Sequence, residues 1–232
     1  MYFFAYFLQT SMSININKKT GINLEKGSKI SLEKDGKRLE RVCVGLNWSA
    51  ITVHETSSFL GMFKQEHTKS VAVDLDGSAS MFSATGDYIE TVYYQQLLSN
   101  DGAIKHSGDD LVGDRDGDDD LDNEVIQVDL TKISSRVGSV FLYLNSYKGQ
   151  DFSAVPYAKI RLFEGVPDRV DSVLATFNIA AEERFKGYIS MVMAKLTRMP
   201  DGSWECTTIG EPIPTRNIQE TVYFIQQNYL KT

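Results

Sequence analysis

Short runs of alternating apolar and polar residues cover most of the chain, and this is the pattern of half-buried β-strands. Turns with Gly or Asp, such as residues 34–37 and 198–202, separate several of these runs. The strands predicted from the pattern are residues 42–46, 71–82, 92–94, 125–130, 140–144, 158–163, 173–179, 188–197 and 203–208. Many short strands of this kind predict a mainly β protein, a β-sandwich of antiparallel strands.

Helical spacing is found near the C-terminus. Four apolar residues there fall at i, i+4, i+7 and i+11, namely Ile218, Val222, Ile225 and Tyr229. Thr215 or Asn217 is the expected N-cap of this C-terminal helix. Residues 49–70 show no clear period, and we expect them to form a long loop or a ribbon.

The chain of 232 residues is 42% hydrophobic and 24% charged, which is ordinary for a globular protein. Since no repeat or Pro/Gly linker divides it, residues 13–232 are predicted to form a single domain behind an apolar N-terminal extension, residues 1–12. Residues 2–8 are all apolar or aromatic, but a membrane span needs about 20 such residues, and no signal-peptide features accompany them. We expect an extension that packs nowhere essential, or alternatively a weak membrane or partner anchor.

One short segment carries the whole net charge of −7. The chain has 31 acidic and 24 basic residues, of which residues 109–124, the acidic segment, hold nine acids and one base. The other 216 residues are therefore nearly neutral, with 22 acids and 23 bases. This balance argues against nucleic acid as a partner, because phosphate binding needs a basic face.

Two cysteines, Cys43 and Cys206, lack the spacing of a metal or redox motif. Cys43 lies in an apolar strand pattern and is expected to be a buried thiol, although one disulfide between the two remains open. The better-supported expectation is a reducing, cytoplasmic compartment.

The acidic segment does not fit an EF-hand loop, which needs Gly at position six and Glu at position twelve. Counting from Asp114 places Asp119 and Val125 at these positions, and counting from Asp118 places Asn123 and Asp129 there, so neither frame fits. Carboxylates without nearby cysteines nevertheless favour Ca²⁺ over Zn²⁺ or copper, and Mg²⁺ prefers to keep its waters. Each Ca²⁺ takes about 6–8 oxygens, so nine carboxylates suffice for two ions.

Asp74 and Asp76 form a second acidic feature, upstream of the segment. Residues two apart on a strand share a face, so both carboxylates are expected to point the same way and to complete the ion's ligands. Backbone carbonyls near Gly108, Gly113 and Gly117 are further donors. The alternative from the residues alone is an acidic loop that stays solvated.

Several ordered motifs resemble the TerD family of tellurite-resistance and stress proteins. They are residues 106–110 (His-Ser-Gly-Asp-Asp), 113–119 (Gly-Asp-Arg-Asp-Gly-Asp-Asp), 124–130, 44–48 (Val-Gly-Leu-Asn-Trp), 73–78 (Val-Asp-Leu-Asp-Gly-Ser), 149–152 and 210–212. The resemblance covers roughly residues 14–230. It implies a β-sandwich with acidic metal-binding loops that hold about two Ca²⁺ ions.

The resemblance also implies which residues bind the ions and what the protein does. Carried over position by position, the ligands are Asp74, Asp76, Asp109, Asp110, Asp114, Asp116, Asp118, Asp119 and Glu124. The implied role is bacterial resistance to tellurite, other chemical stress, phage and colicins, without catalysis. The implied partners are other stress and tellurite-resistance proteins, with association at the inner membrane face as one mode. No small-molecule substrate is predicted.

Three positions depart from the family pattern. Ser49 stands where many members have Asp, and a longer loop follows it. Residues 120–123 intervene between the Gly-Asp-Asp motif and Glu124, and Asp110 is often Asn in relatives.

Two other functions are weighed against a non-catalytic Ca²⁺-binding protein. A metal-dependent hydrolase would use the same carboxylates, with His106 and Arg115 as the local base and phosphate-binding candidates. A Ca²⁺-dependent membrane-docking module would bridge the ions to anionic lipid heads.

Overall fold

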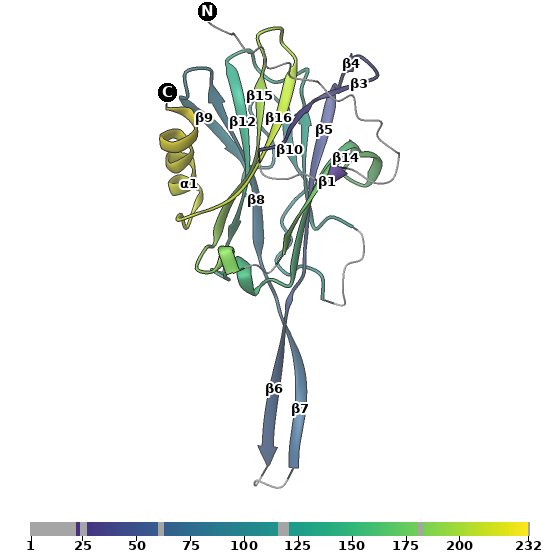
Figure 1. The fold of residues 1–232 in the computed structure, drawn as a ribbon, viewed down its shortest axis with the longest axis vertical. Helices are drawn as coiled ribbons and strands as arrows, with labels where there is room; N and C mark the ends of the chain where they lie inside the picture. Colours follow the sequence, from purple (N-terminus) through teal and green to yellow (C-terminus); the bar gives the residue numbers. More distant parts are fainter. Residues whose placement is uncertain (1–21, 24–26, 60–62, 116–120, 181–182, 232) are drawn as a thin grey trace, which may run out of the picture.

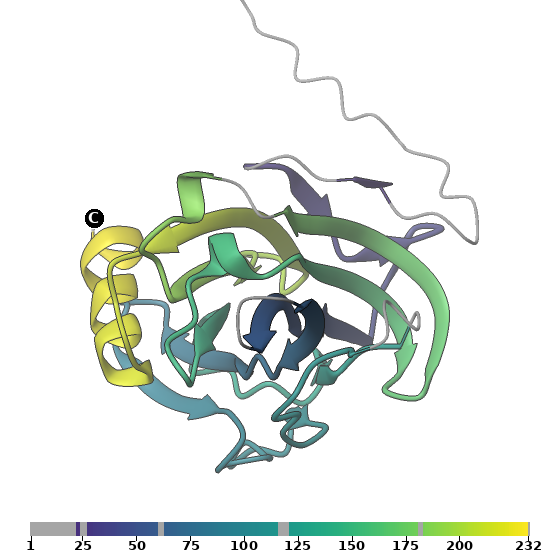
Figure 2. The same cartoon turned by 90° about the horizontal axis from the view of Figure 1, so that it is seen from below.

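The computed structural model describes residues 22–23, 27–59, 63–115, 121–180 and 183–231, and these form two β-sheets packed face to face (Figures 1 and 2). The predicted mainly β sandwich with a C-terminal helix is confirmed. Among the described strands every pair is antiparallel except β1 with β14. The predicted single domain starts at residue 13, and its first residues and the extension 1–12 lie outside the described part.

Each of the two sheets has six strands. The first is ordered β1 (Ile22–Asn23), β14 (Arg169–Ala180), β13 (Tyr157–Val166), β5 (Arg41–Trp48), β11 (Glu124–Asp129) and β10 (Ile104–His106). The second is ordered β2 (Lys29–Ser31), β16 (Trp204–Ile213), β15 (Ser190–Arg198), β12 (Val137–Ser146), β8 (Leu75–Ser83) and β9 (Tyr88–Val92).

Two hairpins stand outside these sheets. They are β3 (Glu33–Lys34) with β4 (Lys37–Arg38), and β6 (Ile51–Phe59) with β7 (Phe63–Val71). The first confirms the predicted turn at residues 34–37. The second confirms the ribbon alternative for residues 49–70, and Figure 1 shows it projecting away from the sandwich.

Strand alternation divides β8 between two hydrophobic cores. Leu75, Ala79 and Met81 face the main core between the sheets, whereas Phe82 belongs to a second cluster on the outer face. The helix α1 (Ile218–Ile225) covers that outer face, and Ile225 is fully buried against it. The N-cap is Asn217, whose side chain accepts from the Glu220 N–H, so one of the two predicted caps is correct.

Short helical turns complete the regular structure. They are η1 (Phe152–Ala154), η2 (Glu183–Phe185) and the π-helical turn η3 (Gln226–Leu230), which follows α1 directly. Tyr229, in this turn, packs on the outer cluster from beyond the end of α1.

The predicted strand at residues 92–94 is wrong in its position. The strand β9 ends at Val92, because Tyr93 and Gln96 form a tight turn through two backbone hydrogen bonds of 2.9 and 3.1 Å. Both cysteines are buried free thiols, so the disulfide that the sequence left open is not formed. Burial raises the pKa of each thiol to about 12, which keeps both protonated and unreactive.

Candidate metal centre

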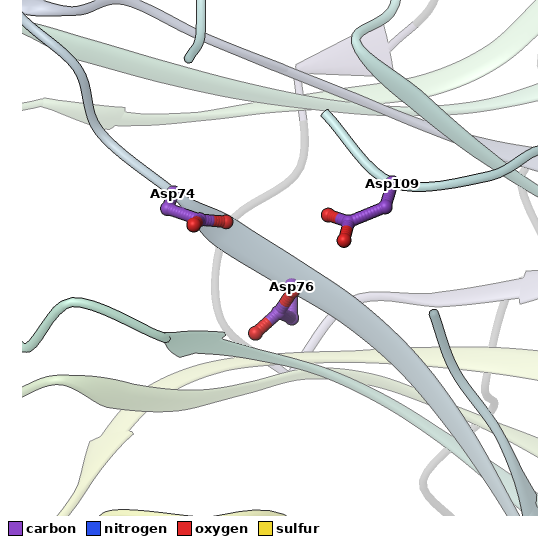
Figure 3. A group of neighbouring side chains, drawn as sticks. All are labelled: Asp74, Asp76 and Asp109. Carbon is purple, nitrogen blue, oxygen red and sulfur yellow. The ribbon is translucent and has the colours of Figure 1, made fainter. Parts of the chain in front are cut away.

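Three of the predicted ligands converge at one end of the sandwich. Asp74 directly precedes β8, Asp76 is its second residue, and Asp109 lies in the loop between β10 and β11. One carboxylate oxygen from each of the three residues lies within 4.8 Å of the other two (Figure 3). Oxygens that share one Ca²⁺ at 2.3–2.6 Å are at most about 5 Å apart, so this acid cluster fits a single ion.

The sequence places these carboxylates by strand alternation. Asp76 lies opposite Asn145 of β12 and shares the outer face of the sheet with it, while its neighbour Leu75 enters the core. Asp74 is held by the Tyr147 N–H, which donates 2.9 Å to its backbone carbonyl. The two aspartates are 2% and 5% exposed, so the cluster is buried on one side and open only beside Asp109.

Burial makes these charges costly in the absence of a cation. Desolvation, followed by repulsion from Glu124, Asp74 and Asp109, raises the pKa of Asp76 to about 8. Desolvation and Asp74 also raise the pKa of Asp109. Lys148, with Nζ 3.3 Å from Asp74 Oδ2, is the one cation paired with the cluster among the described residues. The carboxylates of the cluster therefore carry more negative charge than Lys148 neutralises, and a divalent cation would neutralise the rest.

Glu124 ties the acidic segment to β8. This carboxylate is fully buried, and its Oε2 accepts from the Gly77 N–H at 2.8 Å while Oε1 accepts from the Asp110 N–H at 3.3 Å. Desolvation raises its pKa, and the contact with His106 opposes that shift. Gly77 has no room for a side chain, since a Cβ there would overlap Leu46 Cδ1 and lie 3.1 Å from Glu124 Oε2.

His106 is a buried structural partner of Glu124. Its Nδ1 accepts from the Gly108 N–H at 3.1 Å, so the proton of the neutral ring lies on Nε2. That nitrogen is 3.2 Å from the Gly77 carbonyl and 3.3 Å from Glu124 Oε2, and it donates to both. The ring is 1% exposed and both of its nitrogens make hydrogen bonds, so it fixes the start of the loop between β10 and β11.

Asn123 gathers the carboxylates of Asp110 and Asp114. Its Nδ2 donates to Asp110 Oδ2 at 3.3 Å and to Asp114 Oδ1 at 3.1 Å, and its Oδ1 accepts from the Trp48 N–H at 2.8 Å. Tyr157 donates its hydroxyl to Asp114 Oδ2 at 2.6 Å. These two predicted ligands thus lie apart from the acid cluster and fasten the acidic segment to β5 and β13.

Asp110 also closes a turn of its own. Its Oδ1 accepts from the N–H groups of Val112 and Gly113 at 2.8 and 2.9 Å. Gly113 adopts φ 70° against the indole of Trp48, a position that a side chain cannot occupy.

Asp122, one of the inserted residues, is held by an ion pair that counting the acids of the segment does not reveal. Asp122 is almost fully buried and pairs with Arg161 Nε of β13 through both oxygens, at 2.8 and 2.9 Å. Gly45 of β5 leaves the space that this carboxylate occupies. Asp122 is therefore a structural residue rather than a further ion ligand.

The remaining predicted ligands, Asp116, Asp118 and Asp119, lie outside the described residues, and their assignment stays a prediction. Sequence reasoning missed four residues that shape the site, namely Asn123, Lys148, Asn145 and Arg161. Their partners lie between nine and 76 residues away along the chain, so no local spacing identifies them.

Comparisons with known proteins identify the family of the chain. The family model of the TerD domain matches residues 20–222 of the chain. The chain belongs to the TerD family. Tellurium resistance protein TerZ of Serratia marcescens is 31% identical over 186 residues, which covers 80% of this chain and 87% of that protein.

Another curated protein and a solved structure are also similar to this chain over most of its length. Stress response protein SCP2 of Bacillus subtilis (strain 168) is 28% identical over 192 residues, covering 79% of this chain and 88% of its own. A crystal structure of a homologue of telluride resistance protein (TerD) from Streptomyces coelicolor A3(2) superposes with a TM-score of 0.58 at 19% identity. It covers 84% of this chain and 99% of that one, and it supports the fold.

Several of these relatives are named as tellurium-resistance or stress-response proteins. In the described part of the chain, no helix is long and apolar enough to cross a membrane.

Proposed function

We propose that this TerD-family protein is a non-catalytic Ca²⁺-binding protein of the stress response. The observation that carries the proposal is the convergence of Asp74, Asp76 and Asp109 at one point, two of them buried. Hard carboxylate oxygens at this spacing suit Ca²⁺. When bound, the ion would supply the positive charge that the cluster lacks. The family resemblance also implies a second ion, and it gives Asp116, Asp118 and Asp119 as further ligands without assigning them to one ion.

Terbium luminescence tests the proposal, because Tb³⁺ occupies oxygen-ligated Ca²⁺ sites and a nearby tyrosine sensitises its emission. Tyr94 is the donor, since both Asp76 and Asp109 contribute to raising its pKa. We expect emission that Ca²⁺ displaces, and its loss in Asp109→Asn.

A matched control for this measurement removes one carboxylate elsewhere. Asp171, which pairs with Arg169 at 2.8 Å on the surface, is changed to Asn and should keep the signal. Emission that survives Asp109→Asn, or that disappears equally in the control, would refute the acid cluster as the site.

The hydrolase alternative gains no support from the geometry. Two-metal hydrolysis needs a base that reaches the substrate, and His106 was the local candidate. That ring is 1% exposed and engaged at both nitrogens by Glu124, Gly77 and Gly108.

Membrane docking remains a proposed mode of action, and one observation favours it. Leu111 and Leu121, both on the acidic segment, are 54% and 66% exposed. Exposed leucines beside a Ca²⁺ site can enter a lipid surface whose anionic heads contact the ion. The proposal places the protein in the cytoplasm, where it acts through stress-response partners or at the inner membrane face.

Liposome sedimentation tests this mode. We expect binding to phosphatidylserine vesicles with Ca²⁺ and its loss with chelator, because the ion reverses the local charge. Leu111→Ser with Leu121→Ser should weaken binding by about tenfold or more, since each buried leucine contributes roughly 1.5–3 kcal/mol. The pair Leu97→Ser with Leu98→Ser, which are 43% and 54% exposed and lie outside the segment, is the control. If the same amount of protein sediments with the vesicles with and without Ca²⁺, the docking mode is excluded.

A further inference from the structure

The ribbon of β6 and β7 pairs with no other strand in the described part of the chain. Its register runs from Ile51 opposite Val71 to Phe59 opposite Phe63, and Figure 1 shows it extending away from the sandwich. Because β6 has one neighbouring strand, its outer edge offers backbone N–H and C=O groups to a further strand. A two-stranded ribbon by itself is marginally stable in water, so we expect a third strand to pair with it.

The base of the ribbon is fixed to the sandwich. The Ala50 N–H donates to the Asp114 carbonyl at 2.8 Å, and Gln150 Nε2 donates to the Ala72 carbonyl at 3.0 Å. Ile51, the first residue of β6, is half-buried against the main core. These contacts fix the point at which the ribbon leaves the sandwich. The ribbon therefore forms an arm whose edges pair with neither six-stranded sheet.

The two edges of the ribbon differ in charge. The strand β7 carries Lys64, Glu66 and Lys69, whereas Glu55 is the single Asp, Glu, Lys or Arg of β6. Charged residues on an edge strand hinder pairing with another chain, and β-branched residues favour it. Four of the nine residues of β6 are β-branched, against two of nine in β7. The outer edge of β6 is therefore the one suited to a further strand.

The two faces of the ribbon differ in polarity. Residues opposite one another in an antiparallel pair share a face, so the register places the odd-numbered residues on one face and the even-numbered residues on the other. The apolar residues of both strands all have odd numbers, namely Ile51, Val53, Phe59, Phe63 and Val71. A further strand that slipped by one residue would mix polar residues into the apolar face.

We propose that β6 pairs antiparallel with β6 of a second copy of this chain, with Thr56 on the two-fold axis. In this register Val53 lies opposite Phe59 of the second copy, and Glu55 lies opposite Ser57 of the second copy. No like charges are opposite one another, and odd-numbered residues stay opposite odd-numbered ones. The apolar residues of all four strands then share one face, and the two-fold axis closes the assembly as a dimer.

This pairing also gives the apolar end of each ribbon an apolar neighbourhood. Phe59 and Phe63, at the far end of one ribbon, come to lie beside Val53 at the base of the other. Ile51 and Val71 lie on the same face, two residues further along their strands. Removing these apolar residues from water at both ends of the four-stranded sheet stabilises the dimer.

Shape and charge select this arrangement over its alternatives. Antiparallel pairing places the two sandwiches at opposite ends of the four-stranded sheet, whereas parallel pairing brings both to the same end, where they collide. A two-fold axis at Glu55 places two carboxylates opposite each other, which is destabilising. An axis at Ser57 shortens the paired segment from residues 53–59 to residues 55–59. The axis at Thr56 avoids both losses.

Disulfide cross-linking of the full chain tests the inference. The two copies of Thr56 lie opposite each other with their Cα atoms about 4.5–5.5 Å apart, which suits a disulfide. Thr56→Cys should therefore give a covalent dimer on oxidation. Thr68→Cys, on β7, is the matched control, because three strand spacings, about 14 Å or more, separate its two copies. The native thiols of Cys43 and Cys206 are buried and should give little background.

Sedimentation velocity of the wild-type chain over a range of concentrations measures the dimer without a cross-link. Thr56→Lys should raise the dimer Kd by about three- to tenfold, because it places two lysines opposite each other across the axis. Within its own ribbon the same change faces Glu66 and should not harm the hairpin. Thr68→Lys, opposite His54 on the outer strand, should leave the Kd unchanged.

The outcomes decide between a second copy and any other partner of the ribbon. Cross-linking at position 56 alone, with a dimer that Thr56→Lys weakens, supports the inference. A wild-type chain that stays monomeric at about 0.1 mM overturns it, and this is the result expected if the ribbon serves a lipid surface or another protein. Equal cross-linking at positions 56 and 68, or a Kd that Thr56→Lys does not change, also overturns it. Terbium emission should be the same in wild type and Thr56→Lys, since Thr56 is not part of the acid cluster.

Discussion

Asp76→Asn should stabilise the metal-free protein and at the same time remove the part of the Ca²⁺ response that comes from the acid cluster. The folded pKa of about 8 lies far above the value of 3.8 for a free aspartate. The unfolded chain therefore loses this proton at a lower pH than the folded chain does. Wild-type stability falls as pH rises from about 4 to about 8, and the Asn variant lacks this loss.

The measurement is urea unfolding of both proteins between pH 4 and 8 in the presence of chelator. At pH 7.5 the variant should be more stable by about 2–4 kcal/mol, with the difference vanishing near pH 4. With Ca²⁺ at a hundred times its Kd, the ion at the acid cluster should add about 2.7 kcal/mol to the stability of wild type, and the variant should lack this part of the gain. Parallel pH profiles, or equal stabilisation of both by Ca²⁺, would contradict the assignment of Asp76 as a buried ligand.

Gly77→Ala should destabilise the protein by about 3 kcal/mol, which is the upper range for overpacking a core. A Cβ at this position overlaps Leu46 Cδ1 and crowds Glu124, and both of these side chains are buried. Displacing Glu124 also breaks its hydrogen bonds to Gly77 and Asp110, so Tb³⁺ emission should weaken as well.

A double-mutant cycle checks the cause of this loss. Leu46→Val alone should cost about 1 kcal/mol, but in the Gly77→Ala background it should recover part of the lost stability by making room. Additive costs in chemical unfolding would show that the overlap with Leu46 is not the reason.

The sandwich was predictable because its strands alternate. All but the last residue of the predicted strand 125–130 lies in β11, and residues 140–144 lie in β12; the apolar half of each fills the core as the pattern requires. Short strands and irregular turns were not predicted. The three-residue β10 is too brief to show a period, and Tyr93 turns away from β9 through its pairing with Gln96.

The site was predictable only in part, for a physical reason. Strand periodicity placed Asp74 and Asp76 together, but a run of acids does not reveal which members bond within the protein. Asp114 is engaged by Tyr157, 43 residues away, and Asp122 by Arg161, 39 residues away.

A calorimetric titration of chelator-treated protein with Ca²⁺ tests the central claim most directly. We expect saturable binding of about two ions with Kd on the order of 10⁻⁷–10⁻⁵ M, reduced in number by Asp76→Asn and unchanged by Asp171→Asn. Heat that does not saturate below millimolar Ca²⁺, or the same isotherm for wild type and Asp76→Asn, would contradict the claim.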